Sequence, residues 1–372
     1  MAVVISGTGL YTPSQSISND ELVACFNEYV EKFNLSHSQE ISNGEIVALS
    51  PSDSSFIEKA SGIKSRYVMA KEDILNVDIM APRFQERDND QLSMQAEMGV
   101  AAAKEAMLAA NKTPEDIDLI IVACAYTQRS YPAMAIEIQN ALGCEGWGFD
   151  MLVACSAATF GIINAANAIR SGTAKTVLVI NPEILSPQIN YRDRDSHFIF
   201  GDVATASIIE DESTANGEHV FKIISEQPIT SFSNNIRSNI GYMNNCSPEN
   251  VDDIDKYFIQ QGRKVFKEVL PMVSNLITTE MAKMDLAPEN IKRLYLHQAN
   301  INMNNFIAKK VLGREPDSSE APIILDEYAN TSSAGCIIAL HKNKQGLISG
   351  DKSVLCSCGA GYSACCLLLE YV

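Results

Sequence analysis

Hydrophobic and polar positions follow two recurring patterns along the chain. Short, nearly continuous apolar runs such as IDLIIVACA (117–125) and TAKTVLVINPE (173–183) are typical of buried β-strands. Two longer stretches, SMQAEMGVAAAKEAMLAA (93–110) and GRKVFKEVLPMVSNLITTEMAKM (262–284), carry apolar residues at helical spacing. Strands that alternate with helices in this way predict an α/β fold.

The same order of elements occurs twice. The segment TPEDIDLIIVACA (113–125) has a counterpart in APENIKRLYLHQA (287–299), at an offset of 174 residues (287 − 113). Each copy follows a helical stretch, begins with a Pro-Glu turn or short helix, and continues into a strand and a second helix ending in Leu-Gly. We therefore predict two pseudo-symmetric α/β halves, residues 1–210 and 211–372, that pack together.

The repeat places two chemically different residues at equivalent positions. Cys155, in LVACSAATFG (152–161), aligns with Asn330, in ANTSSAG (329–335). Both precede small residues at an expected strand-to-helix junction. His297, in HQAN, follows the strand of the second copy. We expect the thiol, the imidazole and the amide to converge on one site from three separate segments.

These three groups have a common use in catalysis. The positive end of a helix dipole favours the thiolate of Cys155, and the small residues after it leave backbone N–H groups free to form an oxyanion hole. A neutral His297 and the Asn330 amide can each donate a hydrogen bond to a developing enolate. Cys-His-Asn hydrolases contain the same residue types, but there the histidine is the base for the thiol.

Composition and charge narrow the class of protein. Apolar residues make up 46% of the chain and charged residues 20%, which is typical of a globular protein. The net charge of −17 argues against a nucleic-acid or membrane-surface binder. We find no signal peptide and no apolar run near the ~20 residues that span a bilayer. Ten cysteines without such a signal predict reduced thiols in the cytoplasm. Cys356 and Cys358 lack the partners of a zinc site, so no metal is expected.

The motifs together resemble a known family. ACSAATFG around Cys155, HQAN, ANTSSAG, the C-terminal CGAGYS, FGD at 200–202 and the N-terminal GTGLYTP are similar to those of β-ketoacyl-acyl carrier protein synthase III. The resemblance covers nearly the whole chain. It implies the thiolase-like, five-layered αβαβα fold of condensing enzymes, a homodimer, and an enzyme without a cofactor.

The resemblance also implies a reaction. Cys155 would take an acyl group from acyl-CoA as a thioester, with the backbone N–H groups of Cys155 and Ala360 as the oxyanion hole. His297 and Asn330 would then bind the thioester of malonyl-acyl carrier protein and stabilise the enolate formed by decarboxylation. Attack of that carbanion on acyl-Cys155 would give 3-oxoacyl-carrier protein and CO2, initiating synthesis of a fatty acid or related lipid.

Further residues match the binding positions of the family. Arg194 and Phe56 would contact the coenzyme A nucleotide, and Asn300 the pantetheine arm. Tyr131 would close the acyl pocket across the dimer interface. The basic residues that would dock the acidic carrier protein are Lys267, Lys309 and Lys310.

The chain also departs from the family pattern. Phe56 and Lys59 stand where many members have tryptophan and arginine, Asn302 replaces an arginine, and Ala360 replaces a glycine. Residues 28–50 and 71–90 are expected insertions that border the substrate entrance. These departures leave the acyl chain length, and the choice between a CoA-linked and a carrier-linked donor, open. We interpret FGD as structural, with a buried aspartate as acceptor.

Two alternatives remain. One is a non-decarboxylating condensing enzyme of the hydroxymethylglutaryl-CoA synthase type, which needs a glutamate base and lacks the HQAN pattern. The other is a catalytically silent partner subunit, which would have lost the nucleophile. The presence of Cys155, His297 and Asn330 together argues against silence.

Overall fold

A computed structural model describes residues 2–250 and 253–372. Nine strands join in the order β11-β12-β13-β8-β1-β7-β6-β4-β5. Their bounds are β1 Val3–Tyr11, β4 Leu119–Cys124, β5 Trp147–Leu152, β6 Thr176–Glu183, β7 Val203–Asp211, β8 Phe221–Ser233, β11 Ile291–Leu296, β12 Lys352–Gly359 and β13 Gly361–Tyr371. Two short pairs lie outside this sheet, formed by β2 (Gln15–Ser18) with β3 (Ser65–Val68) and by β9 (Ile236–Arg237) with β10 (Ile259–Gln260).

The strand order confirms the internal repeat. In the first half β4 and β6 are parallel, and β7 lies antiparallel between β6 and β1. In the second half β11 and β12 are parallel, and β13 lies antiparallel between β12 and β8. Two residue pairs between β1 and β8, Val4↔Lys222 and Ile5↔Phe221, connect the two groups of strands. The predicted boundary at 210/211 falls at the last residues of β7 and stays a prediction.

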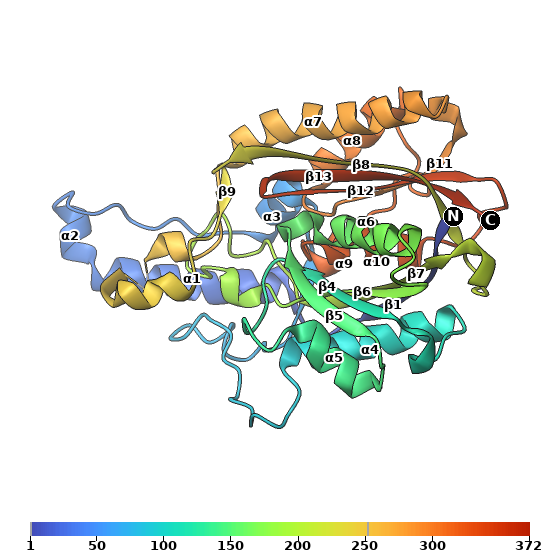
Figure 1. Cartoon of the computed structure of the whole chain (residues 1–372). Helices are drawn as coiled ribbons and strands as arrows, with labels where there is room; N and C mark the ends of the chain where they lie inside the picture. The colour runs from blue at the N-terminus through green and yellow to red at the C-terminus, as the bar shows by residue number, and fades with distance from the viewer. Residues whose placement is uncertain (1, 251–252) are drawn as a thin grey trace.

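Helices complete five layers (Figure 1). The strands of the first half form one layer and those of the second half form another. α4 and α5 cover the outer face of the first-half layer, α6 and α10 lie between the two layers, and α7 and α8 cover the outer face of the second-half layer. The thiolase-like αβαβα arrangement predicted from sequence is therefore confirmed. The helix bounds are α1 Asn19–Ser36, α2 Ser38–Ser42, α3 Ser54–Ser61, α4 Met94–Ala109, α5 Met134–Leu142, α6 Ala157–Arg170, α7 Gly262–Lys283, α8 Ile301–Leu312, α9 Leu325–Tyr328 and α10 Ala334–Lys342.

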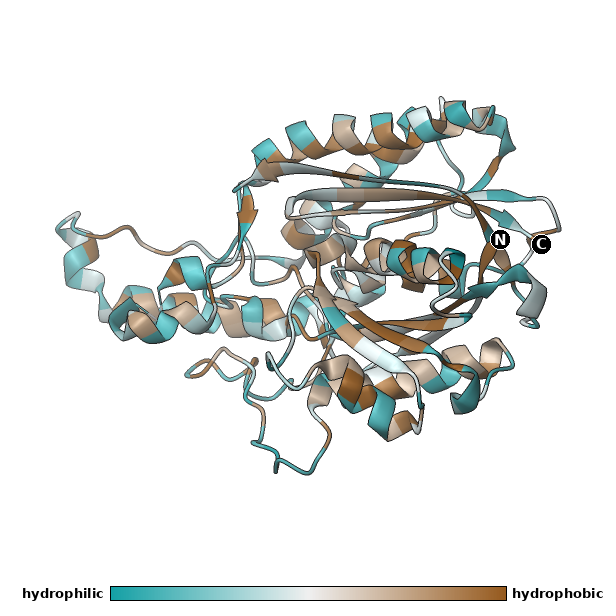
Figure 2. Cartoon of the chain, in the orientation of Figure 1, coloured by the Kyte–Doolittle hydropathy of each residue, from teal (hydrophilic) through white to brown (hydrophobic). Residues whose placement is uncertain are grey.

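The composition of the helices explains their layers. α6 and α10 are rich in alanine, glycine and isoleucine, so they fit between two sheets, and every residue of α10 up to Leu340 is buried. α7 buries one face, which includes Val269, Val273 and Ile277, and turns its charged face to solvent (Figure 2). The two central helices begin at the sheet ends that carry Cys155 and Asn330, so the layering itself brings these residues towards each other.

The two predicted insertions take different forms. Residues 28–50 extend α1 and form α2, which projects from the body of the molecule (Figure 1). Residues 71–90 form a loop without a helix or strand. Part of that loop lines a separate hollow of about 400 Å³ together with Tyr126 and Arg129. Neither insertion lines the cavity described below, and their place at the substrate entrance stays a prediction.

Within the described residues, no helix has both the length and the apolar character needed to cross a bilayer. The same residues contain no group of three or more side chains placed to bind a metal ion. The absence of a metal or cofactor from the reaction stays a prediction.

Candidate active site

One cavity of about 500 Å³ is lined by Cys155, His297 and Asn330. The three side chains come from the junction after β5, the end of β11 and the turn before α10, respectively. The structure thus brings together the three groups that the sequence assigns to one site. Most of the other lining residues are apolar, among them Ile63, Phe198, Ile199, Phe258, Phe266, Val269 and Met303.

The backbone around Cys155 is tightly fixed. Cys155 lies in a short 3₁₀ turn, η2 (Ala154–Ser156), directly before α6. Ala154, just before it, has a φ of 45°, in the left-handed region that alanine rarely adopts. Gly359, at the end of β12, packs so closely that a Cβ there would lie 2.8 Å from the Cys155 nitrogen. Any side chain at Gly359 would therefore displace the nucleophile.

The environment of the thiol differs from the sequence-based expectation. Burial raises the pKa of the Cys155 thiol to about 11, and the neighbouring Ser332 side chain lowers this pKa only in part. Burial at this site therefore favours the protonated thiol over the thiolate. This effect of burial opposes the thiolate expected from the helix dipole, which stays a prediction.

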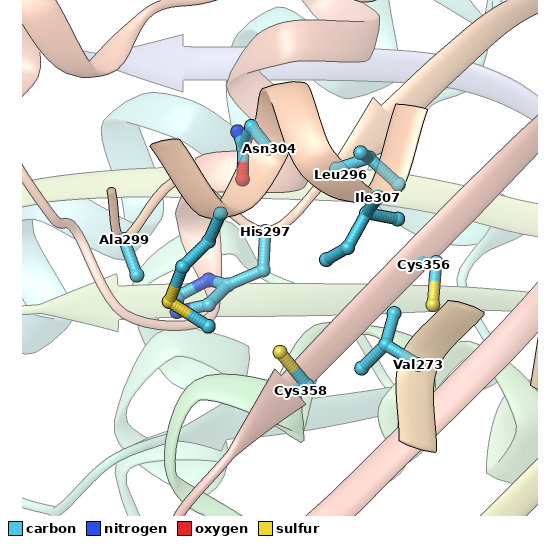
Figure 3. Close-up of a pocket in the computed structure, with 9 residues that line it drawn as sticks. Val273, Leu296, His297, Ala299, Asn304, Ile307, Cys356 and Cys358 are labelled. Carbon is cyan, nitrogen blue, oxygen red and sulfur yellow. The ribbon is translucent and has the colours of Figure 1, made fainter. Parts of the chain in front are cut away.

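His297 is neutral at this site. Its backbone N–H donates to the Cys356 carbonyl over 2.9 Å, which fixes the end of β11 against β12. Burial lowers the pKa of His297 to about 4, and the backbone of Ser332 raises that pKa by a smaller amount. A second cavity, of about 10 Å³, lies beside the ring, and Figure 3 shows the mainly apolar side chains that line it. This apolar lining accounts for the lowered pKa.

Asn330 presents its amide N–H₂ to the cavity. Its backbone is held by an N–H donated to the Ile199 carbonyl over 3.0 Å and by a carbonyl that accepts from Gly201 over 3.1 Å. The side-chain Oδ1 accepts from the Ser332 backbone N–H over 2.9 Å. Because the amide oxygen is used within the turn, the Nδ2 group is the one left to donate to a substrate.

The structure places the predicted oxyanion donors differently. Cys155 lines the cavity, whereas Ala360 lies in the turn between β12 and β13 and is not among the lining residues. The residue that touches the Cys155 backbone is Gly359. The oxyanion role of Ala360 therefore stays a prediction from the resemblance.

Two of the three predicted coenzyme A residues line the cavity, and the third contacts one of them. Phe56 and Asn300 line the cavity, and the Arg194 guanidinium carbon lies 4.4 Å from the centre of the Phe56 ring. Arg194 also donates from Nε to the Pro51 carbonyl over 2.8 Å. Asn300 caps α8 and donates to the Ala60 carbonyl over 2.8 Å. Arg194 and Phe56 thus contact each other here, so a ring that bound between them would first have to separate them.

Tyr131 lies apart from this cavity. Its side chain is 81% exposed and lines no part of the active-site cavity within the described chain. Its predicted role across a dimer interface needs a second copy of the chain and stays a prediction.

The predicted docking lysines occupy two helices. Lys267 lies on α7, next to Phe266, which lines the cavity. Lys309 and Lys310 lie in the last turn of α8, where Lys309 pairs with Glu315. Sequence reasoning missed Arg263, at the start of α7, which lines the cavity itself. The cluster of Arg263, Lys264 and Lys267 in GRKVFK was the available signal.

The structural interpretation of FGD agrees with the contacts. Asp202 is fully buried and accepts hydrogen bonds from the backbone N–H groups of Met69, Leu185 and Ser186 and from the Ser186 hydroxyl. Burial raises the pKa of its carboxyl group. Asp202 does not line the cavity.

Comparisons with known proteins agree with the fold and with the family resemblance. The profiles of the family described as 3-oxoacyl-(acyl-carrier-protein) synthase III match residues 149–226, and those of its C-terminal domain match residues 281–371. A beta-ketodecanoyl-(acyl-carrier-protein) synthase from Pseudomonas aeruginosa is 52% identical over 345 residues, which cover 93% of this chain and 99% of that protein. A beta-ketoacyl-(acyl-carrier-protein) synthase III from Aquifex aeolicus is 28% identical over the full length of both chains.

Solved structures give the same result. The crystal structure of 3-oxoacyl-(acyl-carrier-protein) synthase III from Aquifex aeolicus has a TM-score of 0.76 at 27% identity and covers 99% of this chain and 100% of that chain. The corresponding enzyme from Pseudomonas aeruginosa has a TM-score of 0.77 at 19% identity and supports the fold alone. The family predicted from the motifs is confirmed: this chain belongs to the 3-oxoacyl-(acyl-carrier-protein) synthase III family of condensing acyltransferases.

Proposed function

We propose that this enzyme transfers an acyl group from acyl-CoA to Cys155 and then condenses it with malonyl-acyl carrier protein. The observation that carries the proposal is the meeting of Cys155, His297 and Asn330 on one cavity of about 500 Å³. A catalytically silent subunit would have no use for a thiol, a neutral imidazole and an amide N–H₂ that all face the same cavity. No cofactor enters this reaction.

In the first half-reaction the Cys155 sulfur attacks the thioester carbonyl of acyl-CoA. The thiol proton passes to the departing CoA sulfur, so CoA leaves as a free thiol, while His297, with its pKa lowered to about 4, stays a neutral hydrogen-bond donor. Backbone N–H groups of Cys155 and Ala360 would stabilise the tetrahedral oxyanion. The products are acyl-Cys155 and free CoA.

In the second half-reaction malonyl-acyl carrier protein binds in place of CoA. His297 Nε2–H and Asn330 Nδ2–H donate to its thioester oxygen while the C–C bond to the carboxylate breaks and CO2 leaves. The resulting carbanion attacks acyl-Cys155, and the Cys155 sulfur leaves. Two neutral donors suit this step because the negative charge exists only between decarboxylation and attack.

The acyl donor is proposed to have eight carbons. The name of the 52% identical relative denotes a ten-carbon 3-oxo product, and condensation with malonyl adds two carbons to the donor. The apolar lining of the cavity, with Phe198, Phe258, Phe266 and Met303, is compatible with an aliphatic substrate. Octanoyl-CoA is therefore the donor to test first.

The proposed partners follow from the same reaction. Acyl carrier protein would dock on the basic residues of α7 and α8. A homodimer is supported by the edge strand β5, where Trp147 and Leu152 are 47% and 56% exposed. A cytoplasmic location stays a prediction from the cysteine content.

Kinetic separation of the two half-reactions tests the proposal. Removal of one preorganised donor to an oxyanion typically costs about 10²–10³ in rate. Asn330→Ala should therefore still acylate Cys155 with octanoyl-CoA but decarboxylate malonyl-acyl carrier protein very slowly. An Asn330→Ala enzyme that condenses at the wild-type rate would contradict the assigned role.

A further inference from the structure

Glu183 is a buried acid that the proposed reaction does not use. It is the last residue of β6, its side chain is fully buried, and it lines none of the three cavities described above. Because it does not face the substrate cavity, it cannot be the glutamate base of a hydroxymethylglutaryl-type reaction. Its contacts suggest a different use.

The Glu183 carboxylate joins the two halves of the molecule. It accepts from the Ala125 backbone N–H over 3.1 Å, directly after β4, and from the Ser333 backbone N–H over 3.2 Å, directly before α10. The Ser333 hydroxyl also donates to it. Strand ends of the first half are thereby tied to the turn of the second half that carries Asn330.

That turn needs support from outside. Ala329 and Ser332, on either side of Asn330, have φ values of 58° and 50°. Non-glycine residues in such conformations cost about 1–3 kcal/mol each and persist where surrounding contacts enforce them. Hydrogen bonds from the Ile199–Gly201 segment hold one side of the turn, and Glu183 holds the other through Ser333.

We propose that Glu183 is a positioning residue that, by holding Ser333, aims the Asn330 amide at the thioester oxygen of malonyl-acyl carrier protein. The first half-reaction does not use that amide, so Glu183 serves the second half-reaction selectively. The inference rests on the proposed two-step function.

The chemistry of the contacts favours a carboxylate over an amide here. The two backbone N–H groups reach different carboxylate oxygens, Ala125 one and Ser333 the other. A glutamine would turn its N–H₂ towards one of these donors and leave that donor unpaired, which is unfavourable in a buried site. Ser333 offers two donors and Ala125 one, so the amide oxygen stays at Ser333 and the Ala125 N–H loses its acceptor. Glu183→Gln therefore breaks the tie between the Asn330 turn and the end of β4 while it keeps the size of the side chain.

Titration of Glu183 gives an independent readout. Burial raises the pKa of Glu183 to about 7, against the effect of its hydrogen bonds. The titratable groups that face it, Cys124, Tyr126 and Cys155, all have pKa values raised by burial and stay neutral in this range. As pH falls through 7, protonation replaces one acceptor oxygen with O–H and should slow the second half-reaction.

The experiment compares wild type, Glu183→Gln and Ser333→Ala in two assays. The first follows acylation of Cys155 by octanoyl-CoA with intact-protein mass spectrometry, and the second follows CO2 release from malonyl-acyl carrier protein. We expect Glu183→Gln to lower kcat of CO2 release about 10- to 100-fold, with the KM for the carrier protein and the acylation rate unchanged. The variant should also lack the loss of rate below about pH 7.

The matched control is Glu280→Gln. Glu280 is also buried and accepts from a serine hydroxyl, that of Ser225, but it lies on α7 outside the cavity.

Equal losses in both half-reactions, or a Glu183→Gln enzyme that behaves like Glu280→Gln, would overturn the inference. If Glu183→Gln does not fold, Ser333→Ala decides, because it removes only the hydroxyl donor and should still slow CO2 release selectively. A wild type that fails to become acylated would instead refute the proposed function.

Discussion

Ala154 and Ala329 both have a positive φ, of 45° and 58°. Each directly precedes a residue of the candidate active site, Cys155 in one half of the molecule and Asn330 in the other. Positive φ angles at equivalent junctions thus precede two residues that line one cavity. The internal repeat therefore extends to the backbone strain that presents the reactive groups.

This strain predicts that Ala329→Gly stabilises the protein. Ala329 combines its φ of 58° with a ψ of −159°, a region that glycine adopts far more readily than alanine. Glycine typically lowers the free energy of unfolding by about 0.5–1 kcal/mol, because it gives the unfolded chain more conformational freedom. Relief of the strain at position 329 should exceed this cost and raise the free energy of unfolding by about 1 kcal/mol. Urea denaturation measures the free energy of unfolding.

The control for this prediction is Ala339→Gly. Ala339 is a buried alanine inside α10, where glycine should cost about 1 kcal/mol. A loss of stability of the same size in Ala329→Gly would show that position 329 is not strained.

Acid stability should depend on His297. Burial lowers the pKa of His297 from 6.5 to about 4. A histidine with a depressed pKa stabilises the fold fully above pH 6.5, and that stability is lost as pH falls through the folded pKa of about 4. The shift corresponds to at most about 3 kcal/mol. His297→Gln should therefore lose less unfolding free energy than wild type between pH 7 and pH 4.

Some pH dependence should remain in His297→Gln, because burial also lowers the pKa of His197 to about 4. Denaturant titrations of both proteins at several pH values in this range provide the comparison. Parallel curves for wild type and His297→Gln would show that His297 is not held neutral by burial.

Charge reversal should locate the docking surface for the carrier protein. Lys267 lies beside the cavity-lining Phe266, whereas Lys309 already pairs with Glu315. Exposed charge pairs contribute only about 0.2–1 kcal/mol each, so several residues must be changed together. The double variant Lys267→Glu with Arg263→Glu should raise the KM for malonyl-acyl carrier protein more than the double variant Lys309→Glu with Lys310→Glu. It should also make this KM depend less on salt concentration.

Acylation by octanoyl-CoA in the two double variants separates docking from cavity effects. In the double variant of Lys267 and Arg263, the rate of acylation should change less than the KM for malonyl-acyl carrier protein, because Phe56 and Asn300 remain. A larger carrier KM in the Lys309 and Lys310 pair would move the docking surface to the far end of α8.

The features predictable from sequence are those that follow from local pattern. The strand and helix order, the internal repeat and the alignment of Cys155 with Asn330 all depend on periodicity and spacing along the chain. They predicted two similar α/β halves that pack together and the convergence of three side chains, whereas the five-layered fold was implied by the family resemblance. The family motifs added the reaction class.

The features that were missed depend on contacts between distant segments. Glu183 lies 150 residues before Ser333, and nothing local marks it as a partner of the Asn330 turn. The raised pKa of Cys155 results from enclosure by walls drawn from both halves. The stacking of Arg194 on Phe56, likewise, joins segments far apart in the sequence. Burial and pairing of this kind are set by packing, which a single sequence does not show.

Intact-protein mass spectrometry after incubation with octanoyl-CoA tests the central claim most directly. The account predicts that wild type gains one octanoyl group, that peptide mapping places it on Cys155, and that malonyl-acyl carrier protein then removes it as a 3-oxoacyl product. Cys155→Ala should gain none. An octanoyl group on Cys358, which also lines the cavity, or unchanged labelling in Cys155→Ala would contradict the account.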